Sequence, residues 1–454
     1  MKRLLIITTL TLLTNFLFAQ TVEKLSFTMQ EAVEFAKENN SLVKNSLIDI
    51  EIADKKVWET TAIGLPQVNG SASYSNIFSV PEMSFGPYID WYSMPAGTAI
   101  TPELIGAYTR EGNSIQLGVK ENVTWDITVS QLIFSGEYLV GLQASRTYRE
   151  MSDLGLEKSL LDVKQQVSDA YILVLLLKRN YQNIEKSLEN TKKLLVEMEA
   201  TNKVGFSDKQ GVDQFRLTVA NLGNALLSIQ RQVNTAEMLL KLQMGYEIGK
   251  GISLSQTLDE IFENNDYANY VNQEFSIENN IEYKIFNTQE KLTLLSLKQQ
   301  KSKSLPTLSG FYKHQEQFKS ADFNFFNPNM IGVSLNVPIF SSFSRHSKIQ
   351  QAKLELLKVQ NTKIQVSDGL QVQISQAGND LSTAWEKFTV EKENLCLAEK
   401  IYNDTVIKFK NGTSSGLELT QAQNQMLNTQ SSYFTAMFEV LKAKNTLDKA
   451  LNNL

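Results

Sequence analysis

Side chains that could carry catalysis or bind a metal are few in this chain, and they do not cluster. It has two histidines, His314 and His346, and one cysteine, Cys396. A zinc site or a nucleophilic triad needs several such groups at close spacing. Acidic pairs such as Asp259 and Glu260 fall in helical or inserted sequence, where solvated surface charge is the usual explanation. We therefore expect neither an enzyme nor a metal or cofactor site.

The N-terminus has the pattern of a secretory signal peptide. Lys2 and Arg3 precede an apolar run that ends at Ala19. We expect residues 1–19 to be removed, so that the mature chain begins near Gln20. No later stretch approaches the roughly 18 consecutive apolar residues of a membrane-spanning helix, so any contact with a membrane must be made by strands. The formal net charge of −5 gives no basic surface for nucleic acid.

The sequence contains an internal duplication. The Leu-Pro pair at residues 65–66 recurs at 305–306, and Ile-Phe-Ser at 133–135 recurs at 339–341. Each half is predicted to run helix, strand, loop, strand, very long helix, tight turn and long helix. The first half has an excess of 34 residues at 80–113, which is rich in Pro and Gly and which we predict to be a long loop.

These matches set the expected boundaries of the two repeats. The first repeat covers residues 20–247, with strands at about 66–79 and 115–134 and a hairpin tip at 203–208. Residues 248–276 break the pattern and are predicted to be an insertion at mid-height, an equatorial segment between the repeats. The second repeat covers residues 277–454, with strands at about 306–318 and 330–340 and a tip at 410–415.

A heptad pattern predicts very long, paired helices. Apolar residues recur from Leu160 to Met198 at alternating spacings of three and four, with Thr191 as the one weak position. Such a seam specifies helices packed side by side as in a coiled coil. A helix over residues 138–202 would be roughly 95 Å long at ~1.5 Å per residue, which is too long for a globular domain. It must be supported by its partner helix, residues 210–244, and by other chains.

Two segments, residues 127–134 and 331–340, alternate apolar with polar or small side chains. This is the period of a strand that has lipid on one face and water on the other. With a partner strand before each, a chain has four strands, which leave two open edges and cannot close a barrel. Two chains would give eight strands around a filled interior, whereas three give twelve and can enclose water. A conduit therefore favours a homotrimer.

The loops between these strands are rich in aromatic residues. These side chains are either part of an interfacial girdle or packed within their loops. They are Phe78, Phe85, Tyr88, Trp91, Tyr92, Phe323, Phe325 and Phe326.

Two repeats, each with Leu-Pro before a strand, an Ile-Phe exit into a long helix and a Gly-centred helical hairpin, resemble the TolC family of outer-membrane efflux and secretion channels. The start of the mature chain, residues 25–33 with Asn39, Asn40 and Ala53, is similar to the first helix of that family. The resemblance covers essentially the whole mature chain. It implies an α+β membrane protein in the cell outer membrane: a homotrimeric 12-stranded β-barrel, four strands per chain, continuous with a periplasmic α-helical coiled-coil barrel.

The resemblance also implies partners. Channels of this family do not pump, and a periplasmic adaptor, or membrane fusion protein, joins them to an inner-membrane transporter that supplies the energy. The family places the adaptor-docking surface at the two hairpin tips. In this sequence the matching tip residues are Val204, Gly205, Phe206, Asn411, Gly412 and Thr413. The glycines equally suit a plain turn between helices.

Candidate gating residues follow from the resemblance as well. Family members can place acidic residues just beyond the second tip, in a ring around the channel axis. The matching positions are Glu418 and Gln421, of which only the first is acidic, which weakens the expectation of cation block. The first-repeat counterpart is Gly211, with Asp213 nearby. For Glu418, a charged ring and an ordinary solvated helix surface remain two alternatives.

The leading functional prediction is the outer-membrane duct of a tripartite efflux system for small molecules such as drugs. A type I protein-secretion duct or a metal-efflux duct of the same fold is the alternative. A periplasmic structural coiled-coil rod is the hypothesis from another class, and it would not explain the strands. The lack of Met- or His-rich stretches argues against a dedicated metal route.

Overall fold

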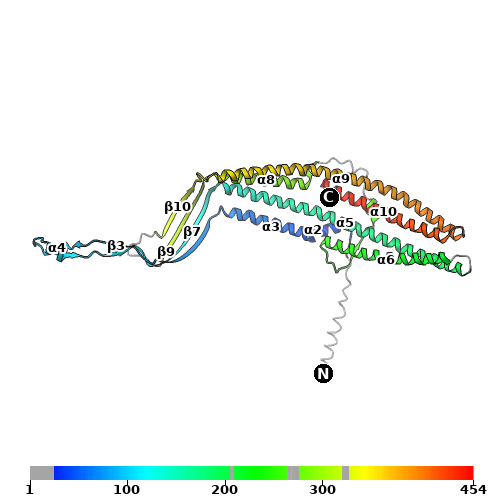
Figure 1. Ribbon diagram of the computed structural model, residues 1–454, viewed down its shortest axis with the longest axis horizontal. Coiled ribbons are helices and arrows are strands. Elements are labelled where there is room, and N and C mark those ends of the chain that lie inside the picture. Colours follow the sequence, from blue (N-terminus) through cyan, green and yellow to red (C-terminus); the bar gives the residue numbers. More distant parts are fainter. Residues whose placement is uncertain (1–24, 205–208, 264–266, 268–275, 320–326, 453–454) are drawn as a thin grey trace, which may run out of the picture. The chain divides into compact units, whose positions relative to one another are not determined.

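A computed structural model describes residues 25–204, 209–263, 267, 276–319 and 327–452 (Figure 1). The chain forms two compact units. The helical unit contains the residues up to Ala53 together with Tyr148–Lys291 and Leu357–Leu454, and the sheet unit contains Asp54–Thr147 and Leu292–Leu356. None of the described helices combines the length and the apolarity that crossing a bilayer requires.

The principal helices occur in pairs of nearly equal length. Two have 22 residues each, two have 68 and 67, and two have 36 each. In chain order, after the short α2 (Met29–Asn39), they are α3 (Ser41–Ala62), α5 (Gly136–Lys203), α6 (Lys209–Met244), α8 (Ile281–Ser302), α9 (Ser344–Lys410) and α10 (Gly416–Leu451).

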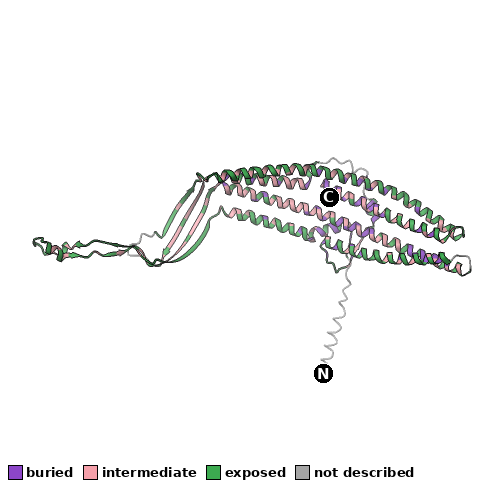
Figure 2. Ribbon diagram, in the orientation of Figure 1, coloured by how far each residue is buried: buried purple, intermediate pink, exposed green. Residues whose placement is uncertain are grey.

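The core of the helical unit lies along the predicted heptad seam. Val163, Val167 and Val174 on α5 are fully buried, and they belong to one apolar cluster with side chains of α6, α9 and α10. Buried side chains are correspondingly concentrated in this unit (Figure 2). Thr191, the weak position of the seam, is also fully buried, because it faces a polar side chain of α10 described below. The one polar position in the heptad seam of α5 therefore lies opposite a polar side chain of α10.

The described part of residues 248–276, the predicted insertion between the repeats, packs into the same core. Its strand β8 (Ile252–Leu254) pairs in parallel with β1 (Leu25–Phe27). Its helix α7 (Leu258–Glu263) buries Phe262 against the rings of Trp385 and Phe388 on α9, at centroid distances of 6.2 and 4.5 Å. The described part of this segment is therefore held by parallel strand pairing and aromatic packing rather than by helix pairing.

The sheet unit is built on a four-stranded antiparallel sheet of order β10-β9-β7-β2. Its strands are β2 (Gln67–Asn76), β7 (Glu121–Ser135), β9 (Thr307–Gln317) and β10 (Asn329–Asn336). Strands β2 and β10 are the open edges of this sheet.

The register gives the sheet one apolar and one polar face. One row across the four strands is Val68, Val129, Tyr312 and Ile331. The row one residue along, which points to the other face, is Asn69, Thr128, Lys313 and Met330. On the polar face Asp126 accepts a hydrogen bond from Ser71 at 2.6 Å. The apolar face is largely uncovered, with Ile331 84% and Val68 66% exposed.

Residues 80–113, predicted from the sequence to be a long loop, are instead ordered, and that prediction was wrong. The ladder of β2 and β7 continues outward as a two-stranded ribbon, in which β3 (Glu82–Ser84) pairs with β6 (Ser114–Gln116) and β4 (Tyr88–Ile89) with β5 (Thr109–Arg110). A 3-10 turn, η1 (Trp91–Ser93), and helix α4 (Pro102–Tyr108) close its end. Turn-forming residues here shape a hairpin rather than irregular chain. Residues 323, 325 and 326 lie outside the described residues.

Candidate functional site at the ends of the helical hairpins

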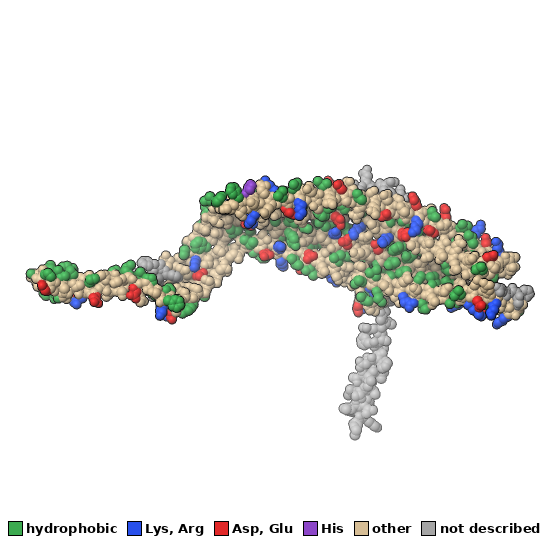
Figure 3. All heavy atoms as spheres, viewed as in Figure 1, with side chains coloured by type: hydrophobic (Ala, Val, Ile, Leu, Met, Phe, Trp, Pro, Cys, Tyr) green, Lys and Arg blue, Asp and Glu red, His purple; other side chains and the backbone are tan. Residues whose placement is uncertain are grey.

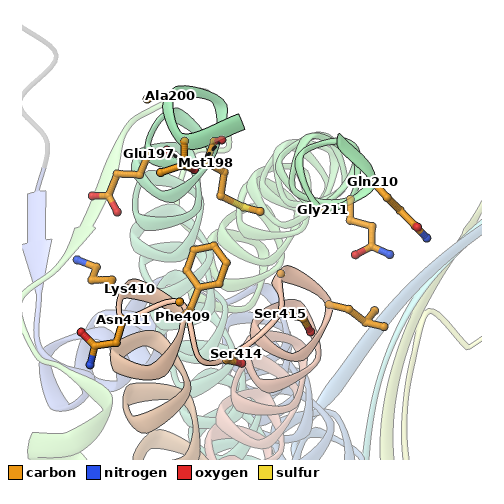
Figure 4. Close-up of a pocket in the computed structure, with 15 residues that line it drawn as sticks. Glu197, Met198, Ala200, Gln210, Gly211, Phe409, Lys410, Asn411, Ser414 and Ser415 are labelled. Atoms are coloured by element: carbon orange, nitrogen blue, oxygen red, sulfur yellow. Dashed lines mark hydrogen bonds between the residues drawn. The ribbon is translucent and has the colours of Figure 1, made fainter. Parts of the chain in front are cut away.

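Four helix ends meet at one extremity of the helical unit. They are the end of α5, the beginning of α6, the end of α9 and the beginning of α10, and they enclose a hollow of about 1040 Å³ (Figure 4). Met198 and Phe409 point toward each other between the helices in this view. The sequence-derived candidates that the structure describes lie on these four ends or in the turn that joins α9 to α10.

The second tip is a helix-ending turn built on glycine. Gly412 has a φ of 71°, a conformation that a residue with a side chain rarely adopts. Its N–H donates to the carbonyl of Phe409 at 3.0 Å, and the N–H of Thr413 donates to that of Lys408 at 2.9 Å. These are the two bonds of a Schellman motif. Asn411, Gly412 and Thr413 are all exposed, so the turn also leaves them open to a partner.

The first tip is only partly within the described residues. Val204 is 67% exposed at the end of α5. Gly205 and Phe206 lie outside the described residues. The exposed Val204 therefore represents the first tip in the structure.

Glu418 is held by the beginning of its own helix. It occupies the third position of α10, where its N–H donates to the Ser415 hydroxyl and its carboxylate accepts from the Ser415 N–H, both at 3.2 Å. The Ser414 hydroxyl donates to the same carboxylate. These hydrogen bonds, Ser414 first and the Ser415 backbone next, lower the pKa of Glu418 from its ordinary value of 4.5. The carboxylate is thus an exposed, ionised cap of α10.

The two other polar candidates lie on the surface. Gln421 is exposed one turn after Glu418. Asp213 is exposed on α6 and lies 3.4 Å from Arg216, whose guanidinium also binds Glu199 of α5 at 2.8 Å. This network ties α5 to α6 within the first hairpin.

Gly211 is a packing site. A Cβ atom built on Gly416 of α10 would lie 3.5 Å from the Cα of Gly211 and 3.0 Å from Cε of Met198. A Cβ atom on Gly211 would in turn lie 3.1 Å from Cε of Met198. The two hairpins thus approach each other closely at a pair of glycines, and the Met198 side chain fills the space beside them.

A small apolar cluster joins the two hairpins beside these glycines. Phe215 of α6 is fully buried and stacks on Phe409 of α9 at a centroid distance of 6.3 Å. The buried members are Leu194, Met198, Val212, Phe215 and Leu419, with Leu195, Tyr402, Val406 and Phe409 packed against them. We call this set the tip cluster. Sequence reasoning placed some of these residues in seams but did not bring them together, because their contacts join separate hairpins.

A buried polar contact lies next to the tip cluster. Gln423 of α10 is fully buried, and its amide donates to the hydroxyls of Ser187, at 3.0 Å, and Thr191 of α5. The hydroxyl of Thr191 donates to the carbonyl of Ser187 at 2.7 Å. Buried amides are costly unless hydrogen-bonded, and here the amide nitrogen is satisfied by α5 whereas the amide oxygen, Oε1, is buried without a hydrogen-bond partner.

The composition of this site is simple. Among the described residues no group of three or more His, Cys, Asp or Glu side chains could hold a metal ion. What the site offers is an exposed glycine turn, a charged helix cap and an apolar join between two hairpins.

Comparisons with known proteins agree with this geometry. Residues 290–453 match the family model described as outer membrane efflux protein. The fold matches CusC (TM-score 0.73, 14% identity, covering 94% of this chain and 92% of that one). It also matches the Campylobacter jejuni outer membrane channel CmeC (0.69, 15%, 94% and 85%) and the open state of the Neisseria gonorrhoeae outer membrane channel MtrE (0.71, 12%, 93% and 88%).

No curated protein matches the sequence itself at a significant level. The matches that exist confirm the resemblance to the TolC family that the sequence motifs indicated. Residues 290–453 thus carry the sequence pattern of the outer membrane efflux protein family, and nearly the whole chain has the fold of solved outer-membrane channels.

Proposed function

We propose that three copies of this chain form the outer-membrane duct of a tripartite efflux system, which passively conducts small molecules such as drugs to the exterior. A periplasmic adaptor and an inner-membrane transporter supply the cargo and the energy. The observation that carries the proposal is the four-stranded sheet with one apolar face, one polar face and two open edges.

The sheet argues for shared closure of a barrel. Open edges do not persist in hydrocarbon, so β2 of one copy must pair with β10 of the next. Three copies give twelve strands, with Val68, Ile331 and their row toward lipid and Asp126 and Lys313 toward water. A barrel of twelve strands can enclose an aqueous passage. A periplasmic coiled-coil rod, the hypothesis from another class, has no use for such a sheet.

An internal two-fold repeat is supported by two equivalent asparagines. The Asn40 side chain accepts from the N–H of Leu42, at the start of α3, and donates to the carbonyl of Gln243, near the end of α6. Asn280 does the same for α8, accepting from the N–H of Glu282 and donating to the carbonyl of Ala450. Each half thereby ties the start of its 22-residue helix to the end of its 36-residue helix, which is consistent with repeats at residues 20–247 and 277–454 and an insertion between them.

At the hairpin ends we propose adaptor docking by the tips and gating by the helix starts. Val204, Asn411, Gly412 and Thr413 are exposed there and available to a partner. Glu418 carries an ionised carboxylate at the beginning of α10, so three copies would place three negative charges near the aperture. Secretion of proteins or efflux of metal ions would use the same duct, and the choice of cargo would rest with the transporter.

Single-channel recording from purified protein in a planar bilayer tests the proposal. We expect detergent-extracted particles with the mass of three chains, and these particles should give discrete conductance steps. Glu418→Gln should reduce the preference for cations over anions, measured as the shift in reversal potential across a salt gradient. Monomeric protein that needs no detergent, or trimers that never conduct, would be incompatible with a duct.

A further inference from the structure

The two-stranded ribbon that extends β2 and β7 has no cover within its own chain. Between residues 77 and 120, all of which the structure describes, no side chain is buried. A lone two-stranded ribbon is at best marginally stable in water. Yet this ribbon keeps two short paired segments, β3 with β6 and β4 with β5. Further backbone hydrogen bonds lie on either side of them, from the Ile77 N–H to the Lys120 carbonyl at 2.7 Å and from the Asp90 N–H to the Tyr108 carbonyl at 2.9 Å.

The ribbon is amphipathic. Met83 pairs with Ile115, and the next residues on the same face are Phe85 and Leu117, whereas Glu82, Ser84, Ser114 and Gln116 make up the other face. At the far end large apolar side chains gather around α4 (Figure 3). Trp91 is 58% and Tyr92 fully exposed. An exposed apolar set of this extent marks a contact surface.

The position of the ribbon limits what can cover it. It runs on from the outer ends of β2 and β7, away from the sheet (Figure 1). From Asn76 to Tyr88 the extension is about 40 Å at ~3.3 Å per residue, so its apolar end lies well beyond the hydrocarbon that the sheet's apolar face requires. The ribbon also carries four acidic and two basic residues, the reverse of the basic clusters that bind membrane surfaces.

In a trimer, the ribbons of the other two copies reach the same distance beyond the hydrocarbon layer. This step rests on the proposed trimer. A twelve-stranded barrel has a radius of roughly 12 Å for a strand spacing of ~4.8 Å and a tilt of ~40°. Three ribbons rooted on that rim start about 21 Å apart, and a lean of roughly 17° over ~40 Å brings their ends to the axis. Tethering by the barrel makes even weak contacts between them effective.

We propose that the ribbons of three copies pack their apolar ends against one another, forming a cap over the outer mouth of the channel. The contact is made by the side chains around η1 and α4, with Tyr92 and Trp91 at its centre. An ion pair and a hydrogen bond within each ribbon join residues at this end: Arg110 lies 3.5 Å from Asp90, and the Asp90 carboxylate accepts from the Ser93 hydroxyl at 2.8 Å. The cap narrows the exit of the channel.

Photochemical cross-linking in whole cells tests the cap. Benzoylphenylalanine is placed at Tyr92 in the full-length protein, and at Ser114 on the polar face as the matched control. We expect irradiation to give dimer and trimer bands of this chain from position 92 and few from position 114. Adducts to lipid or to a different protein, or equal yields from both positions, would overturn the proposal.

A shortened ribbon gives an independent readout. Pro81 and Leu117 are already paired, the Leu117 N–H donating to the Pro81 carbonyl at 2.9 Å. Replacing residues 82–116 with an Asn-Gly turn should therefore keep the sheet intact. We expect this variant to remain trimeric by light scattering and to show a higher single-channel conductance than the wild type. If the shortened variant forms trimers whose conductance equals that of the wild type, the cap is rejected and the duct is not. If the wild-type protein itself forms no trimers, the proposed duct is rejected.

Discussion

The tip cluster predicts how firmly the two hairpins of a chain hold together. Replacing Phe215 with Ala removes a fully buried ring that stacks on Phe409. Such a change costs about 3–5 kcal/mol where the surroundings cannot collapse. The other members of the tip cluster divide equally between the hairpins, with Met198 among the four on the first and Phe409 among the four on the second, so we assign about half of this cost to the contact between the hairpins.

The contact between the hairpins should then weaken by about 2 kcal/mol, which raises the population with separated tips about 30-fold. In a planar bilayer this appears as a higher open probability for Phe215→Ala than for the wild type. Phe434→Ala is the matched control, since it removes an equally buried ring from the main core of the same unit. The double variant with Phe409→Ala should show a coupling of about 0.5–1.5 kcal/mol, as aromatic pairs do.

Two results would refute this reasoning. Phe215→Ala channels that melt earlier but open no more often would show that the tip cluster contributes to folding without restraining the hairpins. Equal opening by Phe434→Ala would show that any loss of core packing loosens the tips.

The remaining predictions concern the helix cap at Glu418, the equivalent residues Asn40 and Asn280, and the four-stranded sheet. Glu418→Ala should lower the melting temperature at neutral pH more than Glu418→Gln, since Gln can keep part of the capping box. Because the pKa of Glu418 is lowered in the folded chain, its contribution is complete above pH 4.5 and is lost as the pH falls through the folded value, so the two variants should converge with wild type in acid. Asn40→Ala and Asn280→Ala should each cost about 1 kcal/mol in denaturant unfolding, and unequal losses would argue against equivalent roles. Val333→Lys should lower the amount of trimer in the outer-membrane fraction, because a lysine on the lipid face costs about 2–4 kcal/mol at mid-bilayer. Ser334→Lys, on the other face of the sheet, should leave that amount unchanged.

Local sequence patterns anticipated much of the architecture because they report local physics. The heptads from Leu160 to Met198 predicted a long helix, and α5 runs through that segment with most of the seam buried and the rest partly buried. Alternation before the Ile-Phe exits predicted strands, and β7 and β10 lie there. The 80–113 segment misled because Pro and Gly signal turns whether or not the flanking chain pairs.

The candidate site was harder to read from the sequence. Glu418 was singled out through the resemblance for a role at the aperture, and its immediate partners, Ser414 and Ser415, are its neighbours in sequence. Gly211 was aligned with an acidic position, yet its near neighbours are Met198 and Gly416, on two other helices. No spacing along the chain encodes that contact.

The sequence by itself therefore determined the elements, since helix and strand periodicities act over a few residues and each names its own apolar face. Only the tertiary structure decided which faces meet: that Phe215 stacks on Phe409, that Gln423 satisfies Thr191, and that Val68 and Ile331 share one row of the sheet. Those contacts depend on the packing of segments far apart in the chain, and packing is selected by the fit of whole surfaces rather than by any local pattern.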